Sequence, residues 1–295
     1  MTISTIIVNF NALGFTREAI SSLLKFTEPH EIIVVDNGSI DENVDLLRSE
    51  FPTVKTIRLQ TNIGFGGANN AGASLARGDI LFFLNNDAYV EQDVVQRLSR
   101  HFEKDLRVGA CGPRLRNPDG SFQFSTGIDP SLIGEWKTRR QNQNKAGAVY
   151  SDSGLIPLSK LSEPVVVDWV TGAALMVRKD VFEMLGGFDD QYFMYFEDAD
   201  LCRRIRLQGM RILYDPTTEL FHHRGVTRVT RIGVTSLEYR KSQLHYYEKF
   251  NGQISILFLR TYLFFKFGLQ WLRSVAWPTR TEERSFAASI IRLLF

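Results

Sequence analysis

The sequence predicts an α/β fold built on a parallel, doubly wound sheet. Two observations support this prediction. Short apolar runs rich in β-branched residues alternate with segments of helical character over residues 5–84, and each apolar run ends in polar or turn-forming residues. Strand–helix alternation is typical of parallel sheets covered by helices on both faces. The 295 residues are enough for one large domain of this kind or for two small ones.

The elements follow in order along the first part of the chain. Buried strands are expected at residues 5–8, 31–35, 54–59 and 80–84. Helical periodicity or a small-residue composition predicts helices at residues 17–26, 41–50 and 66–76. Ligands of such sheets bind outside the carboxyl ends of the strands. We therefore expect one cleft where four polar segments converge, at residues 9–11, 36–38, 61–64 and 85–87.

The second part of the chain is less regular. Residues 126–164 are rich in Ser, Gly, Asn, Gln and Lys with little periodicity, which predicts a long loop over the cleft. An apolar run resumes at residues 165–177, and a late strand is expected at residues 211–214. Between them, the acids Glu197, Asp198 and Asp200 precede an amphipathic helix that stops at Gly209.

These acids have two explanations. Carboxylates in a first helical turn are stabilised by the helix dipole, so they could simply cap the helix. However, a second acidic site lies at Asn85-Asn86-Asp87, also at the end of an apolar run. Two such sites, far apart in sequence, are what a metal ion and a general base require.

Composition narrows the class of protein. With 44% hydrophobic and 23% charged residues and a net charge of +2, the chain does not look like a dedicated nucleic-acid binder. Cys111 and Cys202 are far apart and lack metal-ligand spacing, which favours buried thiols in a reducing cytosol. The first ten residues read as a strand and not as a signal peptide.

The C-terminal segment at residues 254–277 is aromatic and apolar, but Arg260, Lys266 and Arg273 interrupt it. No charge-free run reaches the roughly 20 residues that a membrane span needs. On a helix, one face would carry Leu257, Phe264, Gly268, Trp271 and Val275, and another would carry Lys266, Gln270 and Arg273. This pattern predicts a helix that lies in a membrane interface; a core-packing or dimer helix is the alternative.

Six motifs occur in a fixed order: IIVNFNA, VVDNGS, NIGFGGANNAG, FFLNNDA, TGAALMVRKDVFEMLGGFDDQYFMYFEDADLCRRI and FHHRG. Together they resemble the family 2 glycosyltransferases of the GT-A fold over residues 3–250, in particular bacterial rhamnosyltransferase-like members that build cell-surface polysaccharide. The resemblance implies a Rossmann-like, mixed but mainly parallel sheet flanked by helices. It divides the domain at residues 1–250 into a nucleotide-sugar-binding half, 1–125, and an acceptor and catalytic half, 165–250. Residues 251–295 would be a C-terminal helical extension for membrane association or dimerisation.

The resemblance also implies an activity. It is the inverting transfer of a sugar, with rhamnose as the best guess, from a dTDP- or UDP-linked donor to a hydroxyl of a lipid-linked or polysaccharide acceptor. Mg²⁺ or Mn²⁺ would be the cofactor. The enzyme would be cytoplasmic and peripheral on the inner face of the cell membrane, with a homodimer as a possible assembly and no nucleic acid as partner.

Site residues carry over position by position. Asp198 matches the catalytic base, and Glu197 and Asp200 would orient the loop or contact the acceptor. The donor site would include Val8, Phe10, Asp36, Asn62, Gly66 and Asn86. The metal site would use Asp87 and His222, and Asn85 where the family's Asp-x-Asp motif has its first acid. Trp169, Thr171 and Gly172 would meet the acceptor, although Trp169 could equally be a core residue.

Three other classes are weighed against this one. A non-catalytic sugar-nucleotide-binding homologue, or a membrane scaffold on the same fold, would not need the intact Asp87 and Asp198. An NAD-dependent enzyme would carry GxGxxG after the first strand, and this chain does not. A nucleotidyltransferase on a related fold would carry a basic, glycine-rich phosphate loop there, and the segment Asn9–Ala12 is not such a loop.

Overall fold

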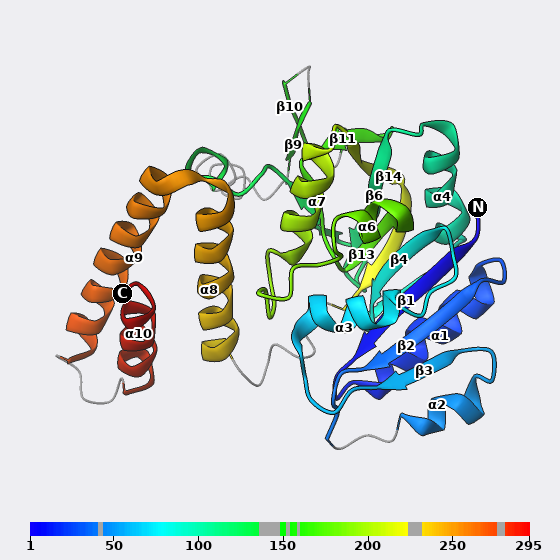
Figure 1. Ribbon diagram of the computed structural model, residues 1–295, viewed down its shortest axis with the longest axis horizontal. Helices are drawn as coiled ribbons and strands as arrows, with labels where there is room; N and C mark the ends of the chain where they lie inside the picture. Colours follow the sequence, from blue (N-terminus) through cyan, green and yellow to red (C-terminus); the bar gives the residue numbers. More distant parts are fainter. Residues whose placement is uncertain (41–43, 136–147, 152–153, 158–159, 224–231, 276–280) are drawn as a thin grey trace.

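A ten-stranded mixed sheet lies at the centre of the structure, with helices on both faces and a group of C-terminal helices at one side (Figure 1). The computed structural model describes residues 1–40, 44–135, 148–151, 154–157, 160–223, 232–275 and 281–295. The main strand order is β11-β14-β6-β13-β4-β1-β2-β3, with β5 paired to β14 and β7 to β6. The predicted α/β class, with its mixed sheet and C-terminal helices, is confirmed.

The N-terminal half contains the four predicted strands. They are β1 (Ile3–Asn9), β2 (Glu31–Asp36), β3 (Lys55–Arg58) and β4 (Ile80–Asn85), and they run parallel to one another. The helices between them are α1 (Leu13–Phe26), α2 (Asp45–Glu50) and α3 (Gly64–Ala73). Helix α1 begins earlier than predicted, and the predicted start of α2 at residues 41–43 lies outside the described residues.

The second half adds strands of both directions. Strand β13 (Ala174–Arg178) is antiparallel to both β4 and β6 (Val108–Arg116), and β14 (Arg211–His222) is parallel to β6. Strand β11 (Val165–Val167) pairs antiparallel with β14 and is the last strand on that side of the sheet. The predicted strand at residues 211–214 is too short, because a register shift between Asp215 and Glu219 absorbs Pro216 and lets β14 continue to His222.

The prediction of a single long loop at residues 126–164 is wrong in part. Strand β8 (Thr126–Gly127) pairs with β12 (Trp169–Val170), and β9 (Ala148–Ser151) forms an antiparallel pair with β10 (Gly154–Pro157). Short strands are held by backbone hydrogen bonds, so they need not show an alternating side-chain pattern. Residues 136–147, 152–153 and 158–159 lie outside the description.

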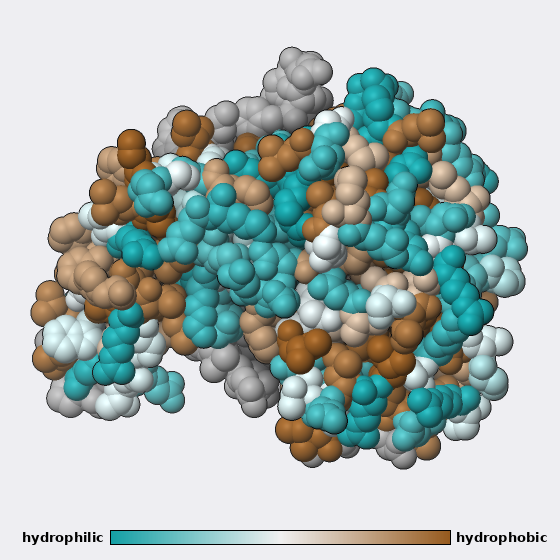
Figure 2. Space-filling model, in the orientation of Figure 1, coloured by the Kyte–Doolittle hydropathy of each residue, from teal (hydrophilic) through white to brown (hydrophobic). Residues whose placement is uncertain are grey.

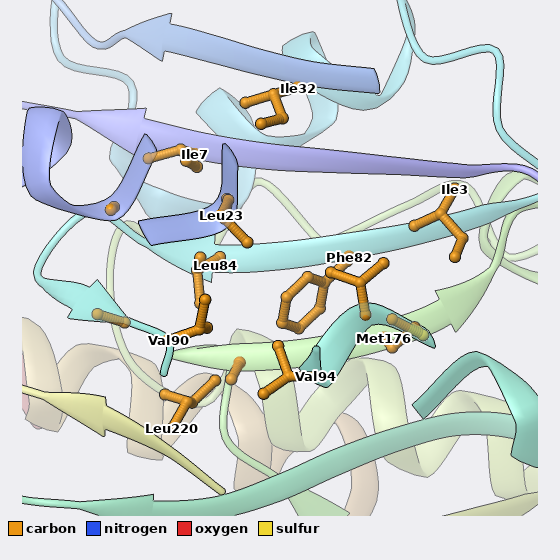
Figure 3. Close-up of a cluster of buried hydrophobic side chains, with 14 of the residues drawn as sticks. Ile3, Ile7, Leu23, Ile32, Phe82, Leu84, Val90, Val94, Met176 and Leu220 are labelled. Carbon is orange, nitrogen blue, oxygen red and sulfur yellow. The ribbon is translucent and has the colours of Figure 1, made fainter. Parts of the chain in front are cut away.

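Alternating side chains of the central strands pack into two cores. On one face, α1, α2 and α4 (Val94–Lys104) cover the sheet, and Leu23 and Val94 point toward Phe82 and Leu84 of β4 (Figure 3). On the other face, α3, α6 (Lys179–Met184) and α7 (Glu197–Leu207) contribute to a second core that also includes Ile6 of β1. The two short strands β5 (Ala88–Tyr89) and β7 (Phe122–Gln123) extend the sheet at the end where the polar residues gather.

The C-terminal helices form a third core. Helices α8 (Ile232–Phe250), α9 (Gly252–Val275) and α10 (Thr281–Leu293) pack together, and Tyr192, Phe196 and Ala199 from the acidic segment join them. The helical extension after residue 250 is therefore present, but its core includes residues of the main domain. Among the helices of the described residues, none is long and apolar enough to cross a bilayer.

One pair of substitutions tests this third core. Leu263 of α9 is fully buried, whereas Phe265 on the same helix is 68% exposed. We expect Leu263→Ala to lower the free energy of unfolding by about 2–5 kcal/mol, because it removes buried methylene groups and leaves a cavity. Phe265→Ala should change it by about 0.5 kcal/mol or less. Urea denaturation measures both values, and equal small effects would contradict the packing of α9.

Candidate active site

The carboxyl ends of the parallel strands lie side by side, as the sequence predicts. Asn9 of β1 is in register with Asp36 of β2, and Asp36 is in register with Arg58 of β3. On the other side of β1, Val8 is in register with Asn85 of β4. One edge of the sheet therefore presents a carboxylate, a guanidinium and two amides.

Asp36 is fully buried at this edge. Its Oδ1 accepts a hydrogen bond from Asn9 Nδ2 at 3.1 Å, and Arg58 Nε lies 3.3 Å from Oδ2. Oδ2 makes no hydrogen bond of good geometry with the protein. A buried carboxylate oxygen normally has a partner, so Asp36 can accept one more hydrogen bond from a ligand at the strand ends.

The other predicted donor residues lie around this edge. Val8 and Phe10, at the end of β1, are partly exposed. Asn86 Nδ2 lies 3.4 Å from Thr16 Oγ1 of α1. The side-chain oxygen of Asn62 accepts from Asn37 Nδ2 and from the Gly64 N–H, both at 2.9 Å. Asn62 therefore holds its own loop in shape.

The glycine run that opens α3 allows a close contact between two segments. Gly64 has a φ of +85°, and a Cβ there would lie 2.5 Å from the Phe193 carbonyl oxygen. At Gly66 a Cβ would lie 3.0 Å from Phe188 Cβ. The Phe65 N–H donates to the same Phe193 oxygen at 3.0 Å. These glycines thus let α3 pack against the segment that leads to the acids.

Asp87 and His222 meet at the end of β14. His222 is in register with Ala88, and the His223 N–H donates to the Asp87 carbonyl at 2.9 Å. His222 Nε2 lies 2.9 Å from Asp87 Oδ1 and 3.2 Å from Asn85 Nδ2. The structure therefore brings the three predicted metal-site residues together.

The donor set fits a divalent cation. Adjacent ligands of an octahedral ion with metal–ligand distances of about 2.1 Å lie about 3 Å apart, close to the 2.9 Å between Asp87 Oδ1 and His222 Nε2. Manganese accepts both carboxylate and imidazole ligands. Within the described residues no group of three or more His, Cys, Asp or Glu side chains is arranged to hold a metal. A cation here would therefore complete its coordination shell with oxygen atoms of the nucleotide-sugar substrate and with water.

The acidic segment approaches the same edge through a strained turn. Tyr195 and Phe196 have φ values of +71° and +69°, which large side chains rarely adopt. The turn starts α7 at Glu197 and lets Asp198 Oδ2 accept from the Gly172 N–H at 2.8 Å. Gly172 is followed by Ala173, whose carbonyl accepts from the Asn85 N–H at 2.9 Å. Asp198 is therefore linked through Gly172 and Ala173 to Asn85 at the end of β4.

Burial shapes the charge of the two acids. Burial, and next the adjacent Asp198, raises the pKa of the Glu197 carboxyl well above its usual value, and Glu197 Oε2 has no hydrogen-bond partner. Burial also raises the pKa of Asp198, while the N–H groups of Gly172 and Ala199 oppose that rise. A carboxylate with a raised pKa is a stronger proton acceptor, which suits a general base.

The remaining predicted residues have structural contacts. Asp200 is fully buried, and it pairs with Arg204 Nε at 2.5 Å and Lys249 Nζ at 2.6 Å, so it joins α7 to α8. Trp169 Nε1 donates to the Ile128 carbonyl at 2.9 Å. The ring of Trp169 lies over Gly127, so the indole is already packed. The Thr171 N–H donates to Ser125 O at 2.8 Å, which fixes the turn before Gly172.

Two residues of this site did not follow from the sequence. Arg58 lies beside Asp36, and its only signal was a basic residue at the end of a strand. Gln123 contacts His222 twice: its Oε1 lies 2.6 Å from His222 Nδ1, and its Nε2 donates to the His222 carbonyl at 3.2 Å. It lies in the two-residue strand β7, far from His222 in sequence, so no motif could indicate it.

Comparison with known proteins decides the family. A family model described as glycosyl transferase family 2 matches residues 4–157, just over half of the chain. The chain belongs to glycosyl transferase family 2. This glycosyltransferase is 31% identical over 226 residues to the N-acetylglucosaminyl-diphospho-decaprenol L-rhamnosyltransferase of Mycobacterium tuberculosis, covering 70% of this chain and 71% of the relative. It is 43% identical over 176 residues to rhamnosyltransferase WbbL of Escherichia coli K12, covering 54% of this chain and 61% of that relative.

Solved structures support the fold of this glycosyltransferase. GalNAc-T7 with UDP, GalNAc and Mn²⁺ matches with a TM-score of 0.57 at 19% identity, over 75% of this chain and 44% of that chain. Staphylococcus aureus TarS 1–349 in complex with UDP matches with a TM-score of 0.56 at 16% identity, over 83% of this chain and 65% of that chain. At these identities the likeness shows the GT-A fold alone. The enzyme class and family predicted from the motifs are confirmed, and transfer of a sugar from a nucleotide sugar follows from the family.

The buried Glu197 generates a prediction about stability. An acid with a raised pKa keeps its proton in the folded state at pH values where the unfolded chain, with an ordinary value of 4.5, has lost it. The free energy of unfolding therefore falls as the pH rises above about 4.5, until the folded-state pKa is passed. Glu197→Gln removes this ionisation, so the variant should gain stability relative to the wild type between pH 5 and pH 8. Urea denaturation across this range tests it, and parallel pH dependences would contradict it.

Proposed function

We propose that this glycosyltransferase inverts the anomeric centre of its donor in one displacement, with Asp198 as the base. The acceptor hydroxyl attacks the anomeric carbon, its proton passes to Asp198, and the bond from that carbon to the diphosphate oxygen breaks. Each carboxylate oxygen of Asp198 accepts one backbone N–H and keeps a second lone pair for the acceptor proton.

One observation carries this proposal: the link from Asp198 through Gly172 and Ala173 to Asn85, at 2.8 Å and 2.9 Å. It sets the only partly exposed acid of the Glu197–Asp200 segment beside the strand end that leads to Asp87. A base on one side of the reacting carbon and a diphosphate site on the other are the arrangement that inversion needs. A double displacement would need a second carboxylate as nucleophile.

A divalent cation held by Asp87 and His222 would neutralise the charge that develops on the leaving diphosphate. The close approach of these two side chains supports this assignment. Asp36, with its open Oδ2, would accept a hydrogen bond from the base or ribose of the nucleotide. The relatives are named as rhamnosyltransferases, and one name includes a decaprenol-linked acceptor. We infer rhamnose as the donor sugar and a lipid-linked saccharide as the acceptor.

Replacement of the base tests the mechanism. We expect Asp198→Asn to reduce transfer by about 10²–10⁴-fold, because an amide cannot take up the acceptor proton. Donor binding should stay nearly unchanged, since Asp198 contacts the acceptor side. The control is Asp190→Asn, which changes an exposed acid of the same segment and should retain wild-type turnover. Rates with dTDP-rhamnose and a lipid-linked acceptor analogue give the comparison, and full activity of Asp198→Asn would exclude this residue as base.

We further propose that α9 docks on the membrane that carries the acceptor. Its outer side is apolar: six residues are at least half exposed, namely Ile254, Leu257, Phe258, Phe265, Leu269 and Leu272. Hydrophobic side chains gather over this region on the left of Figure 2. Lys266 and Arg273 are exposed on the same helix. Exposed aromatic residues with flanking cations favour an anionic lipid surface over the matching face of a second copy.

The docking proposal predicts binding to vesicles. Full-length protein should bind vesicles that contain anionic lipid, with weaker binding at higher salt. Phe258→Ser with Phe265→Ser should weaken binding without unfolding, because both side chains are 62% or more exposed. Flotation of the wild type, the double variant and the control Leu106→Ser, an exposed apolar residue of the main domain, measures this. If the wild type does not bind vesicles but forms a dimer, and the double variant is a monomer, α9 is an oligomer contact instead.

A further inference from the structure

A chain of hydrogen bonds leads from the surface to His222. It begins at the exposed Asp119, whose Oδ1 accepts from Ser121 Oγ at 2.6 Å. Ser121 Oγ accepts from Asn117 Nδ2 at 2.8 Å, and Asn117 Oδ1 accepts from Gln123 Nε2 at 2.8 Å. Gln123 Oε1 then lies 2.6 Å from His222 Nδ1. Asn117, Asp119 and Ser121 belong to the turn between β6 and β7, which lies outside every motif of the family resemblance.

Each bond of this chain fixes the direction of the next. The carboxylate of Asp119 only accepts, so Ser121 must donate to it and is left to accept from Asn117. Gln123 Nε2 has two acceptors in reach, Asn117 Oδ1 at 2.8 Å and the His222 carbonyl at 3.2 Å. The carbonyl can only accept, so it sets the orientation of the Gln123 amide without reference to Asn117. Gln123 Oε1 therefore faces His222 Nδ1.

The orientation of Gln123 decides the tautomer of His222. An amide oxygen accepts only, so Nδ1 must carry a proton and donate to Oε1. In the neutral ring, Nε2 then holds the lone pair. Asn85 Nδ2, a donor at 3.2 Å from Nε2, requires the same tautomer. In that tautomer the Nε2 lone pair faces Asp87 Oδ1 at 2.9 Å, and either a proton on Nε2 or a cation bound to both atoms makes this contact favourable.

We propose that Gln123 is a positioning residue for the metal site: it holds the Nδ1–H tautomer of His222 and so presents Nε2, with Asp87, to the divalent cation. The inference rests on the proposed metal site and deepens it. Gln123 and His222 are 3% and 8% exposed, so water has little room to replace the bond between them. Partners of this kind fix the ring orientation of a metal-ligating histidine and raise its basicity.

The test compares variants that remove different links. Gln123→Met keeps the length of the side chain and removes the acceptor for Nδ1. Asn117→Ala removes the link before it but leaves Gln123 oriented by the His222 carbonyl. Two measurements are made on the full chain. ¹⁵N NMR of histidine-labelled, metal-free protein reports which nitrogen of His222 carries the proton, and a titration with Mn²⁺ alone, followed by EPR of the free ion, gives the affinity.

We expect the wild type to show a protonated Nδ1 and a bare Nε2, and to bind Mn²⁺. Gln123→Met should lose the Nδ1–H signal and bind Mn²⁺ about 10–100-fold more weakly. Asn117→Ala should keep the tautomer and lose less affinity. Near-UV circular dichroism confirms that both variants fold.

Two results overturn the inference, and they are distinguishable. Wild-type Mn²⁺ affinity and an unchanged tautomer in Gln123→Met would show that Gln123 does not position His222, while the metal site itself would stand. A wild type that binds no Mn²⁺, or binds it equally well after Asp87→Ala, would remove the metal site from the proposed function and this inference with it.

Discussion

The left-handed turn at Tyr195 and Phe196 is the constraint on which the active site depends. Each residue in this conformation costs roughly 1–2 kcal/mol for an L-amino acid, and neither is a glycine. The surrounding structure offsets that cost. The Phe193 carbonyl accepts from Phe65, and the Met194 carbonyl accepts from Ser242 Oγ of α8 at 2.8 Å. Without these contacts the chain would relax, and Asp198 would lose its place beside Gly172.

The same turn connects the catalytic edge to the C-terminal helices. Phe196 packs against Tyr239 and Tyr246 of α8, with ring centroids 5.2 Å and 5.6 Å apart. Lys249 of α8 reaches both Asp189 and Asp200 at 2.6 Å, on either side of the turn. The proposed membrane surface and the segment that carries the proposed base therefore share one hydrophobic core. The C-terminal helices therefore hold the turn and the acidic segment in place through direct side-chain contacts.

Much of this arrangement could be predicted from the sequence. The four parallel strands and their polar ends follow from local apolar patterns, and Asp87, Asp198 and His222 follow from ordered motifs. The strand-end residues converge because parallel strands end at one edge. Other features have no local signal. The contact between Gln123 and His222 joins a two-residue strand to a distant one, and Asp200 turns to Arg204 and Lys249 because of how α7 packs on α8. Helix propensity and motif identity do not reveal such long-range contacts.

The stereochemistry of transfer tests the account most directly. NMR of the isolated product gives the anomeric configuration of the transferred sugar, which is compared with that of the donor. A single displacement with Asp198 as base predicts the opposite configuration in the product. Retention of the donor's configuration would contradict the account, because the described site then would have to supply a nucleophile in place of a base.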